Sequence, residues 1–186
     1  MIKKWSSLVK ISHLVFSLPF AIIGFALAFN LYAPAIDWWF LLYIILAVFF
    51  ARNAAMAFNR IADSEFDVKN DRTKNREIPQ KIISKSKAYF FVGVNSMLFI
   101  LVSFFINVLC FKLSFLALII ILSYSLLKRF TWLCHYFLGL SLAISPMGAY
   151  LSISGKFDFV PMILSLSVLF WVSSFDILYA LQDEEF

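Results

Sequence analysis

Residues Ala51–Pro79 read ARNAAMAFNRIADSEFDVKNDRTKNREIP, and the rest of the chain is organised around this stretch. It begins as the polar end of an apolar helix and ends as a loop rich in charge. Asn59, Asp63 and Asp67 are spaced i, i+4 and i+8, so a helix places them on nearly one face, about 6 Å apart per step. Carboxylate and amide oxygens on one stripe can hold a divalent cation, and Mg²⁺ commonly shares its remaining ligands with water and phosphate.

Basic residues follow this acidic stripe at once. Lys69, Arg72, Lys74 and Arg76 come shortly after Asp67. Arginine binds phosphate through its forked donors and lysine acts as a point charge. The combination predicts a site for a metal-bound phosphate at a membrane surface. The alternative interpretation is a solvated loop whose charges only fix topology, which is common beside a membrane helix.

The composition is typical of a membrane protein. The chain has 186 residues, of which 62% are hydrophobic and only 15% charged, whereas a soluble domain carries roughly 25% charged residues. A spanning helix needs roughly 20 mainly apolar residues, and shorter runs qualify if a snorkelling or functional charge lies at a helix end. We therefore predict an all-α, polytopic membrane bundle of six transmembrane helices in one domain, residues 1–186. The six uncharged runs are Ile11–Ile36, Trp38–Ala51, Ala88–Phe111, Leu113–Leu127, Phe130–Gly155 and Phe159–Phe175.

The distribution of basic residues predicts the orientation of these helices. Three lysines precede the first span, seven Lys or Arg lie between the second and third, and two lie between the fourth and fifth. The other side carries only Lys112 and Lys156. The positive-inside rule places the first set, and both termini, in the cytoplasm. The net charge of +5 is thus a topology signal, and a nucleic acid is not an expected partner because no binding motif surrounds these residues.

A second acidic stripe lies near the end of the chain. Asp176, Tyr179 and Asp183 are spaced i, i+3 and i+7, so they share one face of the sixth helix. The predicted topology places this stripe at the same membrane face as the first, which favours a paired metal site. Lys128 and Arg129 return to that face between the fourth and fifth helices. They are either ligands for negative charge or a further topology pair.

The first stripe resembles the signature of the UbiA-type superfamily of intramembrane aromatic prenyltransferases. The family pattern N-D-x-x-D-x-x-x-D appears as Asn59-Arg60-x-x-Asp63-x-x-x-Asp67, with Arg60 in place of the usual second Asp. That form is similar to the 4-hydroxybenzoate polyprenyltransferase-like branch. Two flanking segments fit the same branch, one from His13 to Phe20 and one from Tyr124 through Lys128, Arg129 and Thr131 to His135.

The second stripe resembles the second family signature, D-x-x-Y-x-x-x-D-x-x-x-D. Asp176, Tyr179 and Asp183 match it, and its last Asp would fall one residue beyond Phe186. Family members typically have about nine helices, so six predicted helices indicate a chain that is partial at its C-terminal side. The resemblance extends over essentially the whole of these 186 residues.

The resemblance implies a function and a set of site residues. The expected activity is Mg²⁺-dependent transfer of a polyprenyl group from polyprenyl diphosphate to an aromatic acid, 4-hydroxybenzoate or a close relative, in quinone biosynthesis. The enzyme would lie in the bacterial inner membrane with its site facing the cytoplasm. The implied metal ligands are Asn59, Asp63, Asp67, Asp176 and Asp183, of which the four aspartates are catalytic. The implied substrate-binding residues are Lys10, Arg52, Asn59, Arg72, Arg76, Lys128, Arg129 and Tyr179, with Lys10 or Arg52 facing the acceptor carboxylate.

Two other classes of function compete with this one. The chain could be a catalytically inactive, truncated membrane fragment, as the interrupted second signature suggests. It could also be a small membrane transporter, since six helices suffice for one. The clustering of charges at one membrane face opposes the transporter, because transporter sites usually lie near the midplane. The sequence identifies no partner chain.

Overall fold

The chain is a bundle of helices in the computed structural model, which describes residues 2–10, 14–32 and 38–181. These ranges contain helices and connecting turns but no strand, so the all-α prediction is confirmed. The six long helices α2–α7 correspond to the six predicted apolar segments, while the short α1 was not predicted. The helices are α1 (Ile2–Val9), α2 (Leu14–Tyr32), α3 (Trp39–Asp67), α4 (Lys85–Ile106), α5 (Val108–Leu127), α6 (Cys134–Ser154) and α7 (Phe159–Ala180).

The long helices have the length and surface of membrane spans. Five of them, α3 to α7, are long and apolar enough to cross a bilayer, and the described apolar part of α2, Phe16–Tyr32, is somewhat shorter. Their outer faces expose large apolar side chains such as Phe90, Met97 and Ile119. Lipid solvates such a surface, and a helix satisfies its own backbone groups there. The chain is therefore an integral membrane protein.

The turn between α4 and α5 lies at Asn107, whereas the uncharged runs placed it at Lys112. Asn107 has an extended backbone, and its Oδ1 accepts a hydrogen bond of 2.7 Å from the Cys110 backbone N–H. Its Nδ2 donates to the Leu151 carbonyl of α6 at 3.0 Å. Lys112 lies exposed within α5. An N-cap decides the boundary because it satisfies backbone donors at a helix start, which a single exposed lysine does not do.

Helix α6 is the central helix of the bundle, and glycines let its neighbours approach closely. A Cβ atom on Gly24 of α2 would lie 2.1 Å from the Pro146 carbonyl oxygen of α6. A Cβ atom on Gly139 of α6 would lie 2.4 Å from the Leu169 carbonyl oxygen of α7. Small residues at such crossings allow helix backbones to pack against each other in membranes. The α6–α7 and α2–α6 interfaces are accordingly among the most extensive in the molecule.

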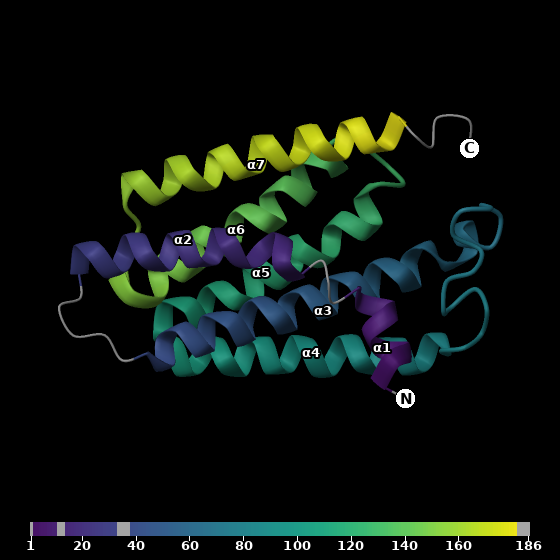
Figure 1. The fold of residues 1–186 in the computed structure, drawn as a ribbon, viewed down its shortest axis with the longest axis horizontal. Coiled ribbons are helices and arrows are strands. Elements are labelled where there is room, and N and C mark those ends of the chain that lie inside the picture. The colour runs from purple at the N-terminus through teal and green to yellow at the C-terminus, as the bar shows by residue number, and fades with distance from the viewer. Residues whose placement is uncertain (1, 11–13, 33–37, 182–186) are drawn as a thin grey trace.

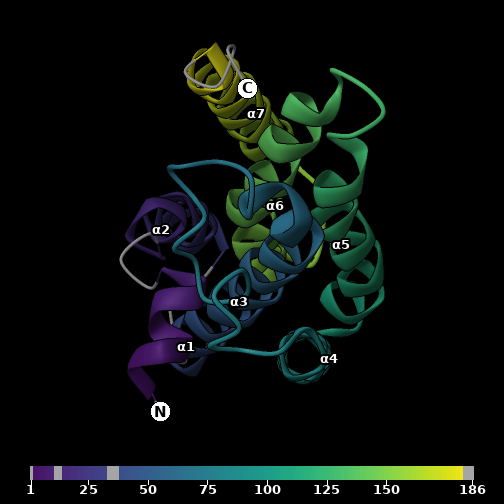
Figure 2. The same ribbon diagram turned by 90° about the vertical axis from the view of Figure 1, so that its right-hand side faces the viewer.

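Residues 68–84, which connect α3 to α4, form a folded segment rather than an extended loop. A series of turns runs through it, and Ile78 and Ile83 are buried against α1, α3 and α4. Figure 1 shows this segment at the same end of the bundle as the last turn of α3, the α5–α6 connection and the end of α7. Figure 2 looks onto that end. The predicted gathering of the polar segments at one end is therefore confirmed.

Candidate functional site

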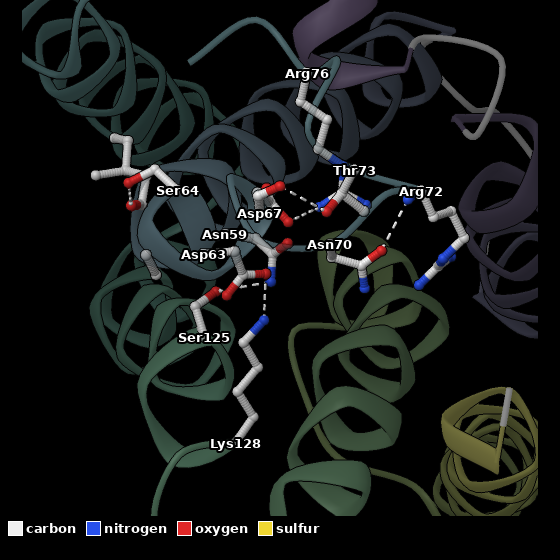
Figure 3. A network of polar contacts seen from close by, with 12 residues as sticks. Asn59, Asp63, Ser64, Asp67, Asn70, Arg72, Thr73, Arg76, Ser125 and Lys128 are labelled. Atoms are coloured by element: carbon white, nitrogen blue, oxygen red, sulfur yellow. Dashed lines mark hydrogen bonds and ion pairs between the residues drawn. The ribbon is translucent and has the colours of Figure 1, made fainter. Parts of the chain in front are cut away.

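The first half of the acidic stripe contacts α5 and the connection that follows it. Asn59 and Asp63 lie on α3, which runs unbroken to Asp67 as the spacing predicted. The Asn59 Nδ2 donates to the Ser125 Oγ at 3.5 Å. The ammonium of Lys128 forms an ion pair with Oδ2 of Asp63, whose side chain is only 13% exposed. Figure 3 shows these four side chains converging.

Asp67 contacts a different partner from Asp63. It is buried, and its Oδ1 accepts a hydrogen bond of 2.7 Å from Nη1 of Arg76 in the folded segment 68–84. Its backbone carbonyl accepts from the Thr73 hydroxyl at 3.2 Å. Its second carboxylate oxygen, Oδ2, is buried without a hydrogen-bond partner in the described residues. The three residues of the stripe therefore have different neighbours. Asn59 and Asp63 face α5 and the connection after it, whereas Asp67 contacts segment 68–84 (Figure 3).

Two arginines of α3 are largely removed from the surface. Arg60, which stands where the family pattern usually has an Asp, is buried, and its Nε lacks a partner among the described residues. Arg52 lies two turns deeper in α3, and its Nε is likewise buried and unpartnered in those ranges. Lys10 is exposed beyond the end of α1. No hydrogen bond or ion pair between described residues joins Lys10 or Arg52 to the acidic stripe.

The other predicted basic residues differ in their surroundings. Arg72 is exposed, and its backbone N–H donates to the Asn70 side chain at 2.9 Å. Figure 3 shows its side chain extending away from Asp67. The Arg129 guanidinium donates to the Ala62 carbonyl and lies 5.1 Å from the centre of the Phe66 ring. Arg129 therefore fastens the α5–α6 connection onto the end of α3.

A cavity of about 570 Å³ opens beside the stripe, between the α5–α6 connection and the end of α7. Lys128 lies in its wall, so this lysine links the stripe to the cavity. Asp176 also lines it, and its Oδ2 is 2.8 Å from the His135 Nδ1. Tyr179 is a lining residue as well, while Asp183 lies outside the described residues. The lining residues are Tyr124, Lys128, Arg129, Phe130, Thr131, Trp132, Cys134, His135, Asp176, Tyr179 and Ala180.

The residues around Asn59 fit a magnesium ion that arrives with a diphosphate. Because the Asn59 Nδ2 faces Ser125, its Oδ1 is turned away from that bond and remains an acceptor. Lys128 contacts Oδ2 of Asp63, and within the described part of the chain no hydrogen bond reaches its Oδ1. Mg²⁺ typically takes one or two such protein oxygens and completes its shell with water and phosphate. Within the described ranges, no three His, Cys, Asp or Glu side chains converge, so the five-ligand, paired metal site stays a prediction.

Ser125, Thr73 and His135 were not predicted to belong to the site, and they contact Asn59, Asp67 and Asp176, respectively. Ser125 and His135 lie in or beside the stretch whose resemblance was noted, but their relation to α3 and α7 depends on packing. Each described acidic residue of the site has a basic partner: Asp63 with Lys128, Asp67 with Arg76, and Asp176 with His135. A site with these pairs can bind a metal and a polyanion together.

Comparison with known proteins extends over most of the chain. The 4-hydroxybenzoate octaprenyltransferase of Aliivibrio fischeri is 30% identical over 149 residues, 80% of this chain and 52% of that protein. The enzyme of the same name from a Marinomonas species is 32% identical over 148 residues, 79% of this chain and 52% of the relative. The chain therefore spans about half the length of these relatives.

Solved structures share the fold. A UbiA homolog from Aeropyrum pernix superposes with a TM-score of 0.83 at 30% identity, over 93% of this chain and 64% of that one. A UbiA homolog from Archaeoglobus fulgidus, bound to DMAPP and Mg²⁺, superposes with a TM-score of 0.76 at 22% identity, over 98% of this chain and 64% of its own. The model of the UbiA prenyltransferase family matches residues 17–186. The chain belongs to the UbiA prenyltransferase family.

Proposed function

We propose that the protein transfers a polyprenyl group from a polyprenyl diphosphate to an aromatic acid such as 4-hydroxybenzoate, with Mg²⁺ as cofactor. Relatives named 4-hydroxybenzoate octaprenyltransferase support the donor and the acceptor classes. The Archaeoglobus fulgidus homolog bound to DMAPP and Mg²⁺ supports the metal. We propose that the reaction belongs to quinone biosynthesis. We also propose that it takes place at the cytoplasmic face of the bacterial plasma membrane, because the distribution of basic residues favours that orientation.

The ion pair between Asp63 and Lys128 carries this proposal. It joins a carboxylate on α3 to a cation in the wall of the cavity, which supports Asp63 as a metal ligand and Lys128 as a phosphate ligand next to it. Both lie at one end of the apolar helices, where the last turns of α3 and the α5–α6 connection meet (Figure 1). That position suits a substrate with a charged head and a lipid tail. It opposes the transporter alternative, since a transport site is expected near the middle of the spans.

In this proposal the metal and the basic residues both bind the diphosphate, through different contacts. Bound Mg²⁺ would offset the negative charge that develops on the leaving group as the allylic C–O bond breaks. Asn59 and Asp63 would hold it through their remaining oxygens, and Lys128 would contact diphosphate oxygens directly. The proposal retains the other predicted ligands of metal or diphosphate, namely Asp67, Asp176, Asp183, Arg72 and Arg76.

The apolar helices would protect the allylic cation from water until the acceptor ring captures it. The ring carbon forms the new C–C bond, and the ring proton then leaves to water or a nearby base. Arg52 is favoured over Lys10 as the partner of the acceptor carboxylate. Its Nε is buried without a partner in the described residues, and a buried polar group of this kind gains from an anion.

The test is prenyl transfer by the full-length protein in its membrane, with and without Mg²⁺. Asp63→Ala removes a metal ligand and is expected to abolish the Mg²⁺-dependent product. Glu65→Gln is the matched control, since Glu65 lies on the same helix but is exposed in a surface pair with Lys85. Full Mg²⁺-dependent transfer by Asp63→Ala would contradict the site. No product from the wild-type protein would favour the inactive alternative, and solute uptake in proteoliposomes without product would favour a transporter.

A further inference from the structure

His135 forms a pair with Asp176, and the proposed mechanism gives a role to Asp176 but none to His135. His135 is the second residue of α6, and its Nδ1 lies 2.8 Å from Oδ2 of Asp176 on α7. Both side chains are 22% exposed, and both line the cavity. Among the described residues, no hydrogen bond reaches the second carboxylate oxygen of Asp176. The pair therefore presents one bound oxygen and one available oxygen at the cavity.

The helix crossing beside this pair fixes the distance between its members. Gly139 lies one turn after His135 on α6, and Ser173 lies three residues before Asp176 on α7. A Cβ atom on Gly139 would lie 2.3 Å from the Ser173 Oγ and 2.4 Å from the Leu169 carbonyl oxygen. Ser173 is buried, and its hydroxyl donates to the Leu169 carbonyl at 2.7 Å. The backbones of α6 and α7 are thus closely packed where the two helices cross, and the His135–Asp176 pair lies next to this crossing.

The chemistry of the two groups determines which atom donates. An ionised carboxylate only accepts hydrogen bonds, so the Nδ1 of His135 must carry the proton in the contact with Asp176. Donation of this kind fixes both the ring orientation and the carboxylate, as outer hydrogen-bond partners of metal-binding groups commonly do. An aspartate held by one oxygen cannot rotate freely, and its other oxygen stays available to a ligand.

We propose that His135 is a positioning residue for Asp176. Its Nδ1–H holds Oδ2, which keeps Oδ1 available to the magnesium-bound diphosphate head of the prenyl donor. This inference rests on the proposed function, since it assigns Asp176 to that head group. It adds a residue that neither acidic signature contains, and it makes a specific claim about one ring nitrogen.

Two substitutions separate the two ring nitrogens of His135. In Asn the amide nitrogen occupies the place of Nδ1, so His135→Asn keeps the donor to Asp176. In Gln the amide nitrogen reaches the place of Nε2, so His135→Gln loses that donor while retaining a polar side chain. Asn, Gln and His all rank within the ordinary range of helix propensities, so neither change breaks α6. His135→Ala removes both nitrogens, and thermal unfolding in detergent verifies that each variant is folded.

The measurement is binding of farnesyl diphosphate to the full-length protein, with Mg²⁺ present and no acceptor added. We expect His135→Ala and His135→Gln to weaken Mg²⁺-dependent binding by about 10- to 100-fold, the usual effect of losing an outer hydrogen-bond partner. We expect His135→Asn to stay within about three-fold of wild type, because the donor is retained. Binding without Mg²⁺ should change little in any of the three.

Asp176→Asn separates failure of this inference from failure of the proposed function. If it weakens binding while His135→Ala does not, His135 does not position the carboxylate and the inference is wrong. If His135→Asn weakens binding as much as His135→Ala, the Nδ1 contact is not the cause and the inference is again wrong. If Asp176→Asn leaves Mg²⁺-dependent binding unchanged, the assignment of Asp176 in the proposed function is wrong, and the role of His135 falls with it.

Discussion

The two ends of the bundle are both polar, but their polar groups are arranged differently. At the end opposite the cavity, Asp158 accepts hydrogen bonds from the hydroxyls of Tyr32, at 2.7 Å, and Tyr150. The Lys156 ammonium lies 4.7 Å from the centre of the Tyr32 ring. The carboxylate and the cation both come from the α6–α7 connection, and their aromatic partners are Tyr32 of α2, which contacts both, and Tyr150 of α6, which contacts Asp158. This cluster, Tyr32, Tyr150, Lys156 and Asp158, is called the tyrosine cluster below.

The cavity end differs in that its acidic groups pair with basic ones and some of its buried charged groups have an atom without a partner. Asp63, Asp67 and Asp176 each face a basic group, and Arg60 and Asp67 keep buried atoms without partners in the described residues. Buried polar atoms without partners are costly, so they persist where function requires them or a ligand satisfies them. The number of polar groups therefore does not by itself mark a site. Among the described residues, the buried charged groups with an unpartnered atom all lie on α3, next to the acidic stripe.

The largest expected effect separates two lysines at opposite ends. Lys128→Met removes the cation that pairs with Asp63, and we expect kcat/KM for prenyl transfer to fall by about 100-fold or more, as for loss of one stabilising donor. Lys156→Met removes a lysine from the tyrosine cluster and should leave kcat/KM within about two-fold, since exposed charges contribute little. Steady-state transfer assays with both variants check this. Equal losses of kcat/KM in the two variants would mean that the two ends do not differ in function.

A stability effect is expected where α6 crosses α7. Gly139→Ala places a methyl group against the Leu169 carbonyl, and Gly148→Ala on the same helix meets nothing within 4 Å. Both changes gain the same helix propensity, so their difference isolates the packing. We expect Gly139→Ala to have a free energy of unfolding about 1–3 kcal/mol below that of Gly148→Ala, the usual cost of overpacking. Denaturation in detergent measures it, and similar values would show that the crossing tolerates a methyl group.

Local patterns predicted the fold and the position of the polar groups well. The apolar runs, the i, i+4 relation of Asn59 and Asp63, and the gathering of polar segments at one end all follow from hydropathy and helical geometry. The turn at Asn107 was misplaced because a side-chain cap leaves no trace in a charge pattern. The pair of His135 with Asp176 also escaped prediction, since it forms only when α6 packs on α7.

The position of Asp67 shows that regular spacing along a helix does not by itself determine which residues form a site. Eight residues along an α-helix rotate a side chain by roughly 80°, so Asp67 stands well away from the direction of Asn59. That rotation brings it within reach of segment 68–84, whose Arg76 and Thr73 bind it. The spacing predicted a shared face, but the segment decides what Asp67 contacts. Its metal role stays a prediction.

A smaller effect should distinguish a buried ion pair from a surface pair within segment 68–84. Arg76→Gln leaves the buried Asp67 carboxylate without its charged partner, and loss of one partner of a buried pair is strongly destabilising locally. We expect trypsin to cleave this segment several-fold faster at Lys69, Arg72 and Lys81, which both variants keep, since local opening governs cleavage. Lys74→Gln breaks the exposed pair with Asp71 and should change the trypsin rate at these sites little. Equal trypsin rates at these sites for both variants would show that Asp67 does not hold the segment in place.

The smallest expected effect is a pH dependence at the tyrosine cluster. Hydrogen bonds from Tyr150 and Tyr32 lower the pKa of Asp158 below its ordinary value. A carboxyl group with a lowered folded-state pKa contributes stability above its unfolded-state pKa of about 3.9 and loses it as the pH falls through the folded-state value. Wild-type protein should therefore lose more stability than Asp158→Asn between about pH 4 and the lowest pH at which it stays folded. Thermal unfolding in detergent across that range measures the difference. Parallel curves for the two proteins would mean that the cluster stabilises the neutral acid as well as the carboxylate, and that its hydrogen bonds, unlike the ion pairs at the cavity, do not depend on charge.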